Sequence, residues 1–507
     1  MSGRCIGVPV TSSISLPSSR SVEPLQAVVV SAGIVVLWAL WAAVFNTAQF
    51  GDNIEQFNWA QSLELGYHKH PPLPSWALAV VIKLFGPSVY WAYVLATLCL
   101  LGTMGFTWLI GRELIGDRLA ASGVVLWGLN LSFSQRAQLY NHNTVLVLCI
   151  AACVWLAMRA SRDERPHWLW WGATGVAAGA AMLAKYQALV PLGGLLIALV
   201  WSGRLRRPAQ WAGLALALVV MVAVLAPHAA WVVRNDFTTL RYASDAVEVA
   251  TPWMRLRFVV AFVANQLRLA FPALLTITIA WIWIYRTRGD LDTSVDAAIV
   301  PAVNRWMTGL IWFTLAVLLV MALASGVSLR NHWGVQALQF FPLWLAMWWD
   351  RRIKIDLTVL LTTAVLVQAG SLGFYAAEHR DPHTIVSNRR IDTAYPARRL
   401  ARAAVAHWAS ATNCPLHYVE GSVFDAGLVS LYSGGHIQVF DSDRATPWVR
   451  PEDLQRDGGL FVLDEGDAVP PSVGNLKVFH LVPERNPLGL TGKTLTLGIR
   501  LPAKPCP

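Results

Sequence analysis

Charged side chains are scarce in this chain. Only 14% of the 507 residues are Asp, Glu, Lys or Arg, while 55% are hydrophobic. Soluble domains carry about 25% charged residues, so a surface with so few charges must face lipid over most of its area. The 25 tryptophans agree with this interpretation, because indole rings favour the two membrane–water interfaces. The composition therefore predicts a protein embedded in a lipid bilayer.

The chain also lacks a basic stripe or arm, although its net charge is +10. Its basic residues form short clusters between apolar runs, the pattern that sets topology in a membrane. We therefore expect no nucleic-acid partner. The first apolar run is long and lacks a small-residue cleavage site, so it is expected to be retained as a span rather than removed as a signal peptide.

The apolar runs predict about 11 transmembrane helices when roughly 20 residues are required for each crossing. Arginine clusters follow alternate spans, beginning with Arg112 and Arg118, and such clusters stay in the cytoplasm. With a cytoplasmic N-terminus and an odd number of spans, the C-terminus is expected outside. The predicted spans are residues 25–46, 88–110, 119–134, 144–158, 168–184, 187–201, 209–231, 257–285, 306–325, 335–349 and 356–376.

Composition changes after residue 377, where the chain becomes polar and rich in Pro and Gly. We expect a cytoplasmic tail (1–24), a transmembrane domain (25–377) whose first external loop is 46–87, and a small periplasmic α/β domain (378–507). In the last part, Leu400, Ala404 and Trp408 share one face of a predicted helix over 394–411. Predicted strands cover 416–419, 436–440, 459–463 and 476–481.

Two of the six cysteines, Cys414 and Cys506, lie in this predicted external domain. An oxidising exterior permits a disulfide between them. Compartment and pairing number alone leave the pairing open.

The first external loop holds the most informative segment. Asp52 and Glu55 precede the run Gly66-Tyr67-His68-Lys69-His70-Pro71-Pro72, whose two prolines fix a rigid corner near the bilayer surface. Between Asp52 and Gly66 apolar and polar residues alternate, which predicts an amphipathic helix lying along the membrane. The two acids can serve catalysis, or they can simply stabilise the N-terminus of that helix. Position alone favours the structural role.

An acid fourteen positions before Gly-Tyr-x-x-His-Pro-Pro resembles the first periplasmic loop of bacterial GT-C glycosyltransferases. These enzymes belong to the protein O-mannosyltransferase superfamily (glycosyltransferase families 39 and 83), which includes the lipid A aminoarabinose and galacturonic acid transferases. Further landmarks recur in the family's order. They are Tyr140-Asn141-His142-Asn143, Ala184-Lys185-Tyr186, Pro227 and Trp231 with Asn235-Asp236-Phe237, and Leu329-Arg330-Asn331-His332-Trp333.

The resemblance implies an inverting glycosyltransferase at the periplasmic face of the bacterial inner membrane. Its donor would be a polyprenyl-phosphate sugar and its acceptor lipid A, another glycan or a lipid. Asp52 would be the general base, beside an oxocarbenium-like transition state. The family often has Asp-Glu at this position and this chain has Asp52-Asn53, so Glu55 is expected as helper or substitute.

The leaving phosphate needs cations or hydrogen-bond donors. The resemblance assigns this task to Lys185, Arg330 and His332, although the first two are long cationic side chains at span ends that can also snorkel to the interface. The same resemblance places Tyr67, Lys69, His70, Tyr140 and Asn143 in the substrate site.

Some relatives bind a metal near the His-Pro-Pro corner with an acid that Lys69 replaces here. We therefore expect no metal and no other cofactor. Two alternatives to the glycosyltransferase remain open: a transporter or flippase of a lipid-linked substrate, and a non-catalytic membrane scaffold. The transporter is weakened because no internal repeat or matched pair of broken spans is visible.

Overall fold

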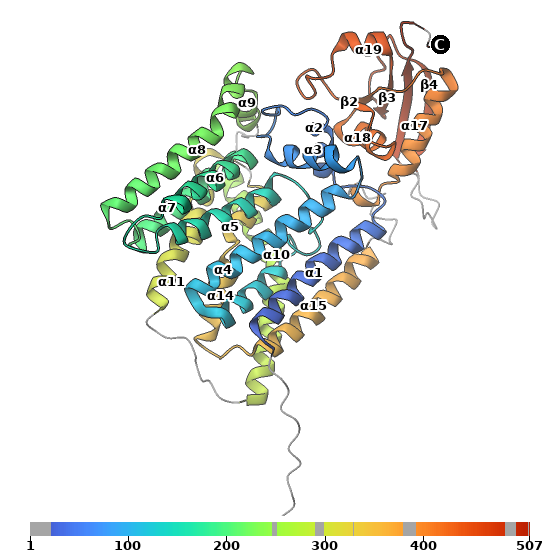
Figure 1. The fold of residues 1–507 in the computed structure, drawn as a ribbon. Coiled ribbons are helices and arrows are strands. Elements are labelled where there is room, and N and C mark those ends of the chain that lie inside the picture. Colours follow the sequence, from blue (N-terminus) through green and yellow to red (C-terminus); the bar gives the residue numbers. More distant parts are fainter. Residues whose placement is uncertain are drawn as a thin grey trace, which may run out of the picture.

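The computed structural model describes residues 22–245, 251–288, 299–327, 329–378, 392–481, 493–504 and 506. These residues form a helical bundle with a small sheet domain at one end (Figure 1). All but the last three residues of the predicted N-terminal tail (1–24) lie outside the described residues.

Seven helices in the described segments are long and apolar enough to cross a bilayer, so the chain is a multi-pass membrane protein. The count of eleven is not confirmed. The element α4 (Trp91–Gly128) covers most of the two predicted spans 88–110 and 119–134, and its backbone is not helical at Gly116 (φ 79°, ψ 167°), where two helical segments meet at a kink. The seven are α1 (Pro24–Phe45), α4 (Trp91–Gly128), α5 (His142–Ala160), α8 (Pro208–Arg234), α10 (Pro252–Arg288), the run α11–η2–α12 (Val300–Met307, Thr308–Phe313, Thr314–Ser325) and α15 (Leu357–Glu378).

Shorter helices fill the rest of the bundle: α6 (Trp168–Ala184), η1 (Tyr186–Ala188), α7 (Leu189–Trp201), α13 (Asn331–Leu338) and α14 (Phe341–Asp350). Glycines let α6 approach α8 closely, as is common between membrane helices. A Cβ atom on Gly179 would lie 2.7 Å from Val224 Cγ1, and one on Gly175 would overlap the carbonyl oxygen of Ala217.

The predicted span 119–134 is wrong in its second half. Helix α4 ends at Gly128, and the following residues form turns. Asn130 Oδ1 accepts the backbone N–H of Ser132 (2.9 Å), and such local side-chain bonds compete with helix formation. The turn segment 129–139 carries Arg136, and its Leu131 N–H bonds to the carbonyl oxygen of Leu269 on α10.

The C-terminal part is a small α/β domain, as predicted. Its helices α17 (Ala397–Ala411), α18 (Val423–Tyr432) and α19 (Pro451–Asp457) accompany five strands, β1 (Tyr418–Gly421), β2 (Gln438–Phe440), β3 (Gly459–Asp464), β4 (Gly474–Leu481) and β5 (Lys493–Arg500). The strand order is β2-β1-β3-β5-β4; β1 is parallel to β2 and β3, and β5 is antiparallel to β3 and β4. The sequence patterns missed α18, α19 and β5.

Two sequence inferences about this domain can be compared with its packing. Leu400, Ala404 and Trp408 are buried on one face of α17, as predicted. Cys414 and Cys506, whose pairing the sequence left open, form a disulfide that ties the segment before β1 to the end of the chain.

The first loop contains two helices, α2 (Gly51–Trp59) and α3 (Leu73–Phe85), which lie between the bundle and the sheet domain (Figure 1). The expected helix exists as α2, but protein covers its apolar residues where the sequence predicted contact with the membrane surface. Its apolar residues Ile54 and Phe57 are buried. Helix α18 covers this face, and a Cβ atom on Gly427 would overlap Ile54.

Gln61, just after α2, bonds to the sheet domain with its whole amide group. Its Nε2 donates to Ser430 Oγ (3.0 Å) and to the carbonyl oxygen of Ile437 (3.1 Å). Its Oε1 accepts the backbone N–H of Val439 (3.0 Å), at the edge strand β2. The sheet domain is therefore docked on the segment that carries Asp52 and Glu55.

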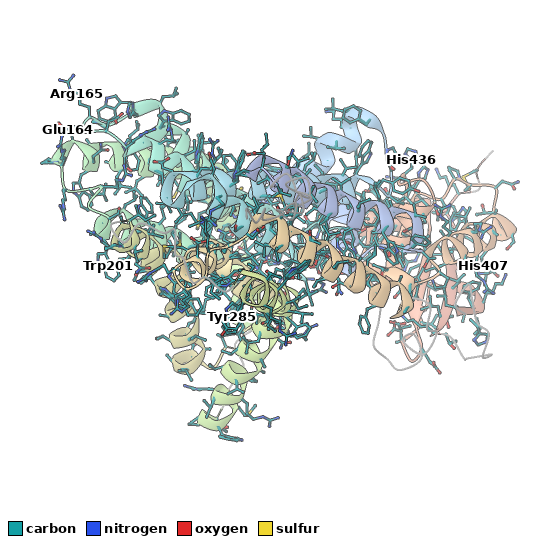
Figure 2. The ribbon with its side chains drawn as sticks, turned by 90° about the horizontal axis from the view of Figure 1, so that it is seen from below. Glu164, Arg165, Trp201, Tyr285, His407 and His436 are labelled. Carbon is teal, nitrogen blue, oxygen red and sulfur yellow. A yellow bond between two sulfur atoms is a disulfide. The ribbon has the colours of Figure 1, made fainter. Side chains whose placement is uncertain are left out.

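The two ends of the molecule differ in composition. Glu164 and Arg165, in the arginine-bearing connection between α5 and α6, lie at the opposite end from His407 and His436 of the sheet domain (Figure 2). The bundle thus separates that basic connection from the sheet domain and from the loop helices beside it.

Gly427→Leu should disrupt the docking, because the new side chain has no room between α18 and α2. We expect a loss of about 1–3 kcal/mol, typical of overpacking, seen as a lower melting temperature of the protein in detergent. Gly370→Leu is the control, since a Cβ atom on that helical glycine meets nothing within 4 Å. Equal melting temperatures for the two variants would contradict the tight α2–α18 contact.

Candidate functional site

A buried chain of hydrogen bonds joins three helices and the end of a fourth. His142, the first residue of α5, has Nδ1 3.0 Å from the carbonyl oxygen of Ala184 and Nε2 3.0 Å from Gln56 Nε2. A carbonyl can only accept, so Nδ1 carries the proton and Nε2 accepts from the amide. Gln56 Oε1 accepts in turn from Ser75 Oγ (2.8 Å). This chain holds α2, α3, α5 and the end of α6 in one arrangement.

Asn53 makes a second buried link, from α2 to the turn before α5. Its Oδ1 accepts the backbone N–H of Tyr140 (2.8 Å), while its Nδ2 donates to Gln49 Oε1 (2.8 Å) and to the carbonyl oxygen of Gln138 (3.1 Å). A carboxylate cannot donate, so a glutamate here would face two oxygens without a proton to share. The amide at position 53, where relatives often have an acid, therefore fits this packing.

These links bring Asp52 beside the start of α5. Asn141 Nδ2 donates to Asp52 Oδ2 (2.7 Å). Two residues on, Asn143 Oδ1 accepts from Lys185 Nζ (2.8 Å) and from Gln336 Nε2 (2.9 Å). Burial lowers the pKa of Lys185 to about 8, and the Asp52 carboxylate partly opposes that shift. One helix start thus holds a carboxylate and an ammonium group close together.

A cavity of about 390 Å³ borders Asp52 and is lined by arginines from three separate segments: Arg136, Arg268 and Arg330. In the part of the chain that the structure describes, none of the three forms a salt bridge. Such a surplus of positive charge suits an anion, which guanidinium groups bind with paired hydrogen bonds. Other lining residues are Phe50, Gly51, Ser132, Leu139, Asn141, Asn143, Thr144, Val147, Leu269, Asn331, His332 and Val335.

His332 lines the same cavity but contributes no charge. Burial lowers its pKa to about 2, and repulsion from Lys185, Arg136 and Arg330 adds to that shift. The ring is neutral at physiological pH and can offer only a hydrogen bond. Lys185, Arg136 and Arg330 therefore all lie within electrostatic reach of the His332 ring.

Arg136 and Arg268 were missed by the sequence reasoning. Arg268 lies inside the predicted span 257–285, and an arginine within a span is itself a signal of a functional site, so this residue could have been found. Arg136 carried no such signal, because it follows a segment that was expected to be helical and instead forms turns.

Glu55, one turn after Asp52, has a different environment. Its Oε1 lies 2.7 Å from Lys69 Nζ. Burial raises the pKa of Glu55, with Lys69 opposing and the carboxylates of Asp52 and Asp441 adding to the rise. Neither Glu55 nor Lys69 lines the arginine cavity. Lys69 also lies 5.8 Å from the ring centroid of Tyr242, so the pair forms a separate corner beside α9 (Thr238–Asp245).

Three other predicted site residues lie behind the cavity rather than in its wall. Tyr67 stacks on Trp59 with ring centroids 5.0 Å apart, and its backbone N–H bonds to the carbonyl of His70 (3.1 Å). The Tyr140 hydroxyl donates to the carbonyl of Pro74 (2.8 Å). The His70 ring lies 4.2 Å from that of His142. These residues shape the corner and the turn that carry Lys69 and Asn141.

Among the described residues, no three His, Cys, Asp or Glu side chains are grouped so that they could hold a metal ion. The absence of a metal stays a prediction.

The chain is similar to several known proteins. Residues 69–231 match the family described as dolichyl-phosphate-mannose-protein mannosyltransferase. Lipid A galacturonosyltransferase RgtD of Rhizobium johnstonii is 26% identical over 343 residues, 64% of this chain and 67% of that protein. Lipopolysaccharide core galacturonosyltransferase RgtA of the same organism is 30% identical over 187 residues, 36% of this chain and 37% of that protein.

A solved structure shows the same fold. ArnT from Cupriavidus metallidurans, bound to undecaprenyl phosphate, superposes with a TM-score of 0.59 at 14% identity, covering 95% of this chain and 99% of ArnT. The apo state of ArnT gives a TM-score of 0.53. The chain therefore has a GT-C fold with a small C-terminal sheet domain, and it resembles the glycosyltransferases that modify lipid A.

Asn53→Asp should destabilise the protein, because the new carboxylate would face Gln49 Oε1 and the Gln138 carbonyl without a proton to donate. We expect a loss of about 1–3 kcal/mol, the cost of leaving buried polar groups unpaired. The measurement is the melting temperature in detergent at pH 7. Asn413→Asp, at an exposed position, is the matched control and should melt like the unmodified protein. A stable Asn53→Asp variant would show that this amide is not needed.

Proposed function

We propose that this protein is an inverting glycosyltransferase that moves a sugar from a polyprenyl-phosphate donor to a hydroxyl of a lipid or glycan acceptor in the envelope. One observation carries the proposal. Asp52 stands at the edge of a cavity that Arg136, Arg268 and Arg330 line, with Lys185 beside it. A carboxylate next to a cationic cavity is what transfer from a sugar phosphate requires.

Asp52 acts as the general base. It takes the proton of the acceptor hydroxyl as that oxygen attacks the anomeric carbon from the face opposite the phosphate. Asn141 donates to Asp52 Oδ2, which leaves Oδ1 to accept this proton. The bond between the anomeric carbon and the phosphate oxygen breaks, and its electron pair leaves with the lipid phosphate. Inversion follows from this single displacement.

Lys185 and Arg330 stabilise the negative charge that grows on the leaving phosphate, with Arg136 and Arg268 beside them. Such stabilisation needs cations that are already in position. The buried His142 network holds Lys185 in place through the carbonyl of Ala184, the residue before it. Asn143 orients the ammonium group directly.

The charge of the cavity favours an acidic sugar. Three arginines line the cavity, and Lys185 bonds to the lining residue Asn143 from outside it, so four positive charges stand against the single negative charge of Asp52. A phosphodiester neutralises only one of the three that remain. A carboxylate on the transferred sugar would neutralise another, whereas an amino sugar would be repelled. We therefore propose a uronic acid as the transferred sugar, in line with the galacturonosyltransferase names of RgtD and RgtA.

The cavity, α2, α9 and the sheet domain belong to the outer face of the membrane in this proposal. Helices α2 and α9 and the sheet domain lie towards the same end of the bundle (Figure 1). The basic connection with Arg165 lies at the other end (Figure 2), and such connections stay in the cytoplasm. The donor's lipid tail then lies in the bilayer and its sugar faces the periplasm.

Asp52→Asn should abolish transfer while leaving donor binding intact, because the amide keeps the shape but cannot take a proton. We expect kcat to fall about 10²–10⁴-fold, the usual contribution of a general base. The assay is transfer in proteoliposomes with a polyprenyl-phosphate uronic acid donor.

Glu55→Gln is the companion variant, and it should keep at least a tenth of the activity because Lys69 already occupies that carboxylate. Full activity of Asp52→Asn would refute the assigned base. Movement of the donor across the bilayer without transfer in the unmodified protein would support a flippase instead.

Donor binding should depend on the protonation of Lys185. Because burial lowers its pKa to about 8, the free enzyme loses this cation as pH rises through 8. A bound phosphate favours the charged form, so the effect belongs to kcat/KM rather than to kcat. We expect kcat/KM for the donor to fall about tenfold between pH 7 and pH 9. Lys185→Arg stays charged over this range and should give a flat profile; the same fall in that variant would exclude Lys185 as its cause.

A further inference from the structure

A second cavity, of about 570 Å³, lies in the sheet domain, apart from the arginine cavity. Its position follows from the topology. The connections β1–α18–β2 and β2–α19–β3 run in opposite directions across the sheet, so right-handed crossovers place α18 and α19 on opposite faces. The cavity lies on the face covered by α19. Its lining residues are Glu420, Phe440, Asp443, Pro451, Leu454, Gln455, Ser472 and Arg500.

The polar groups of this cavity come from different strands and loops. Glu420 on β1 is paired in register with Phe440 on β2, so the carboxylate and the ring lie side by side on one face. Arg500 Nη1 lies 4.0 Å from Glu420 Oε2, and Arg500 Nε donates to Ser472 Oγ (3.0 Å). Asp443 stands beyond the end of β2. The cavity thus offers acceptors, donors and an aromatic surface together.

Its charge is opposite to that of the arginine cavity. Glu420 and Asp443 outweigh Arg500 by one negative charge, which disfavours phosphates and acidic sugars. Two carboxylates that accept and an arginine and an amide that donate match the hydroxyl groups of a sugar ring. A few convergent polar groups beside an apolar surface are typical of small-molecule sites. The chemistry favours a neutral or amino sugar.

The segment after β2 connects this cavity to the membrane domain. Asp443 lines the cavity, while Asp441, two residues earlier, lies within electrostatic reach of Glu55 and Lys69. Arg444 Nε donates to Thr238 Oγ1 (3.1 Å) on α9. One short segment therefore forms a wall of the cavity and touches the corner next to Asp52.

We propose that this cavity binds an unphosphorylated neutral or amino sugar of the acceptor glycan, other than the sugar whose hydroxyl is glycosylated. The inference rests on the proposed function, because it assigns to the sheet domain the acceptor of that transfer. Binding there would hold the acceptor across the segment 441–444 and direct another part of the glycan towards Asp52.

The test uses the full chain in detergent with two variants, Glu420→Gln and Asp443→Asn. Asp443→Asn removes a charge from the cavity without breaking the Glu420–Arg500 pair. It therefore still tests the site if Glu420→Gln fails to fold. Glu452→Gln, an exposed acid of α19 outside the cavity, is the matched control. We expect the KM for the acceptor to rise about tenfold in both variants, with kcat and the donor KM unchanged and the control like the unmodified protein.

Binding of a glucosamine disaccharide without donor, measured by saturation-transfer NMR, separates the two proposals. If the NMR signal is lost in both variants but kept in the control, the site is supported. If the unmodified protein then shows no sugar transfer, only the proposed function is refuted. Normal transfer with an unchanged acceptor KM and an undiminished NMR signal in both variants would overturn the site and leave the proposed function standing.

Discussion

The two hydrogen bonds of His142 fix the positions of the helices that carry the candidate site residues. One reaches the carbonyl of Ala184, the residue before Lys185, and the other reaches Gln56, one turn after Asp52 and Asn53. In a buried, low-dielectric setting an unmade hydrogen bond is costly, so the ring holds α2, α5 and the end of α6 together. Asp52 lines the arginine cavity, and Lys185 reaches Asn143 in the wall of that cavity, because this imidazole connects the elements that carry them.

Helix α2 is held from two sides, and its two acids differ for that reason. The bundle side fixes Asn53 and Gln56, and the sheet domain fixes the other side through Gly427 and Gln61. Asp52 then meets a neutral amide and the arginine cavity, whereas Glu55 meets Lys69. Two carboxylates one turn apart thus acquire different environments, as is common where one acid acts and its neighbour supports.

The two cavities have opposite net charge. The arginine cavity has more positive charge than one phosphate needs, which fits an acidic sugar phosphate. The sheet-domain cavity has a negative excess, which fits an uncharged or amino sugar. The segment 441–444 lies between the two: Asp441 is within electrostatic reach of Glu55 and Lys69, and Arg444 bonds to α9. A donor and an acceptor of different charge would accordingly be sorted before they meet at Asp52.

Composition and periodicity alone determined that the chain crosses a membrane, where most helices run, and which face of α17 is buried, because each of these is a local property of the chain. The motif order also placed Asp52, Asn143, Lys185, Arg330 and His332 in one neighbourhood, and the structure brings them together. Only the tertiary structure decided the rest. Arg136 and Arg268 join that cavity from segments far apart in sequence, Tyr67 and Tyr140 turn inward, and α18 rather than lipid covers α2. Contacts between distant segments produce no periodic pattern in the sequence of either segment. The sequence could therefore identify Asp52 as a candidate site residue, but not all of the residues that line the cavity beside it.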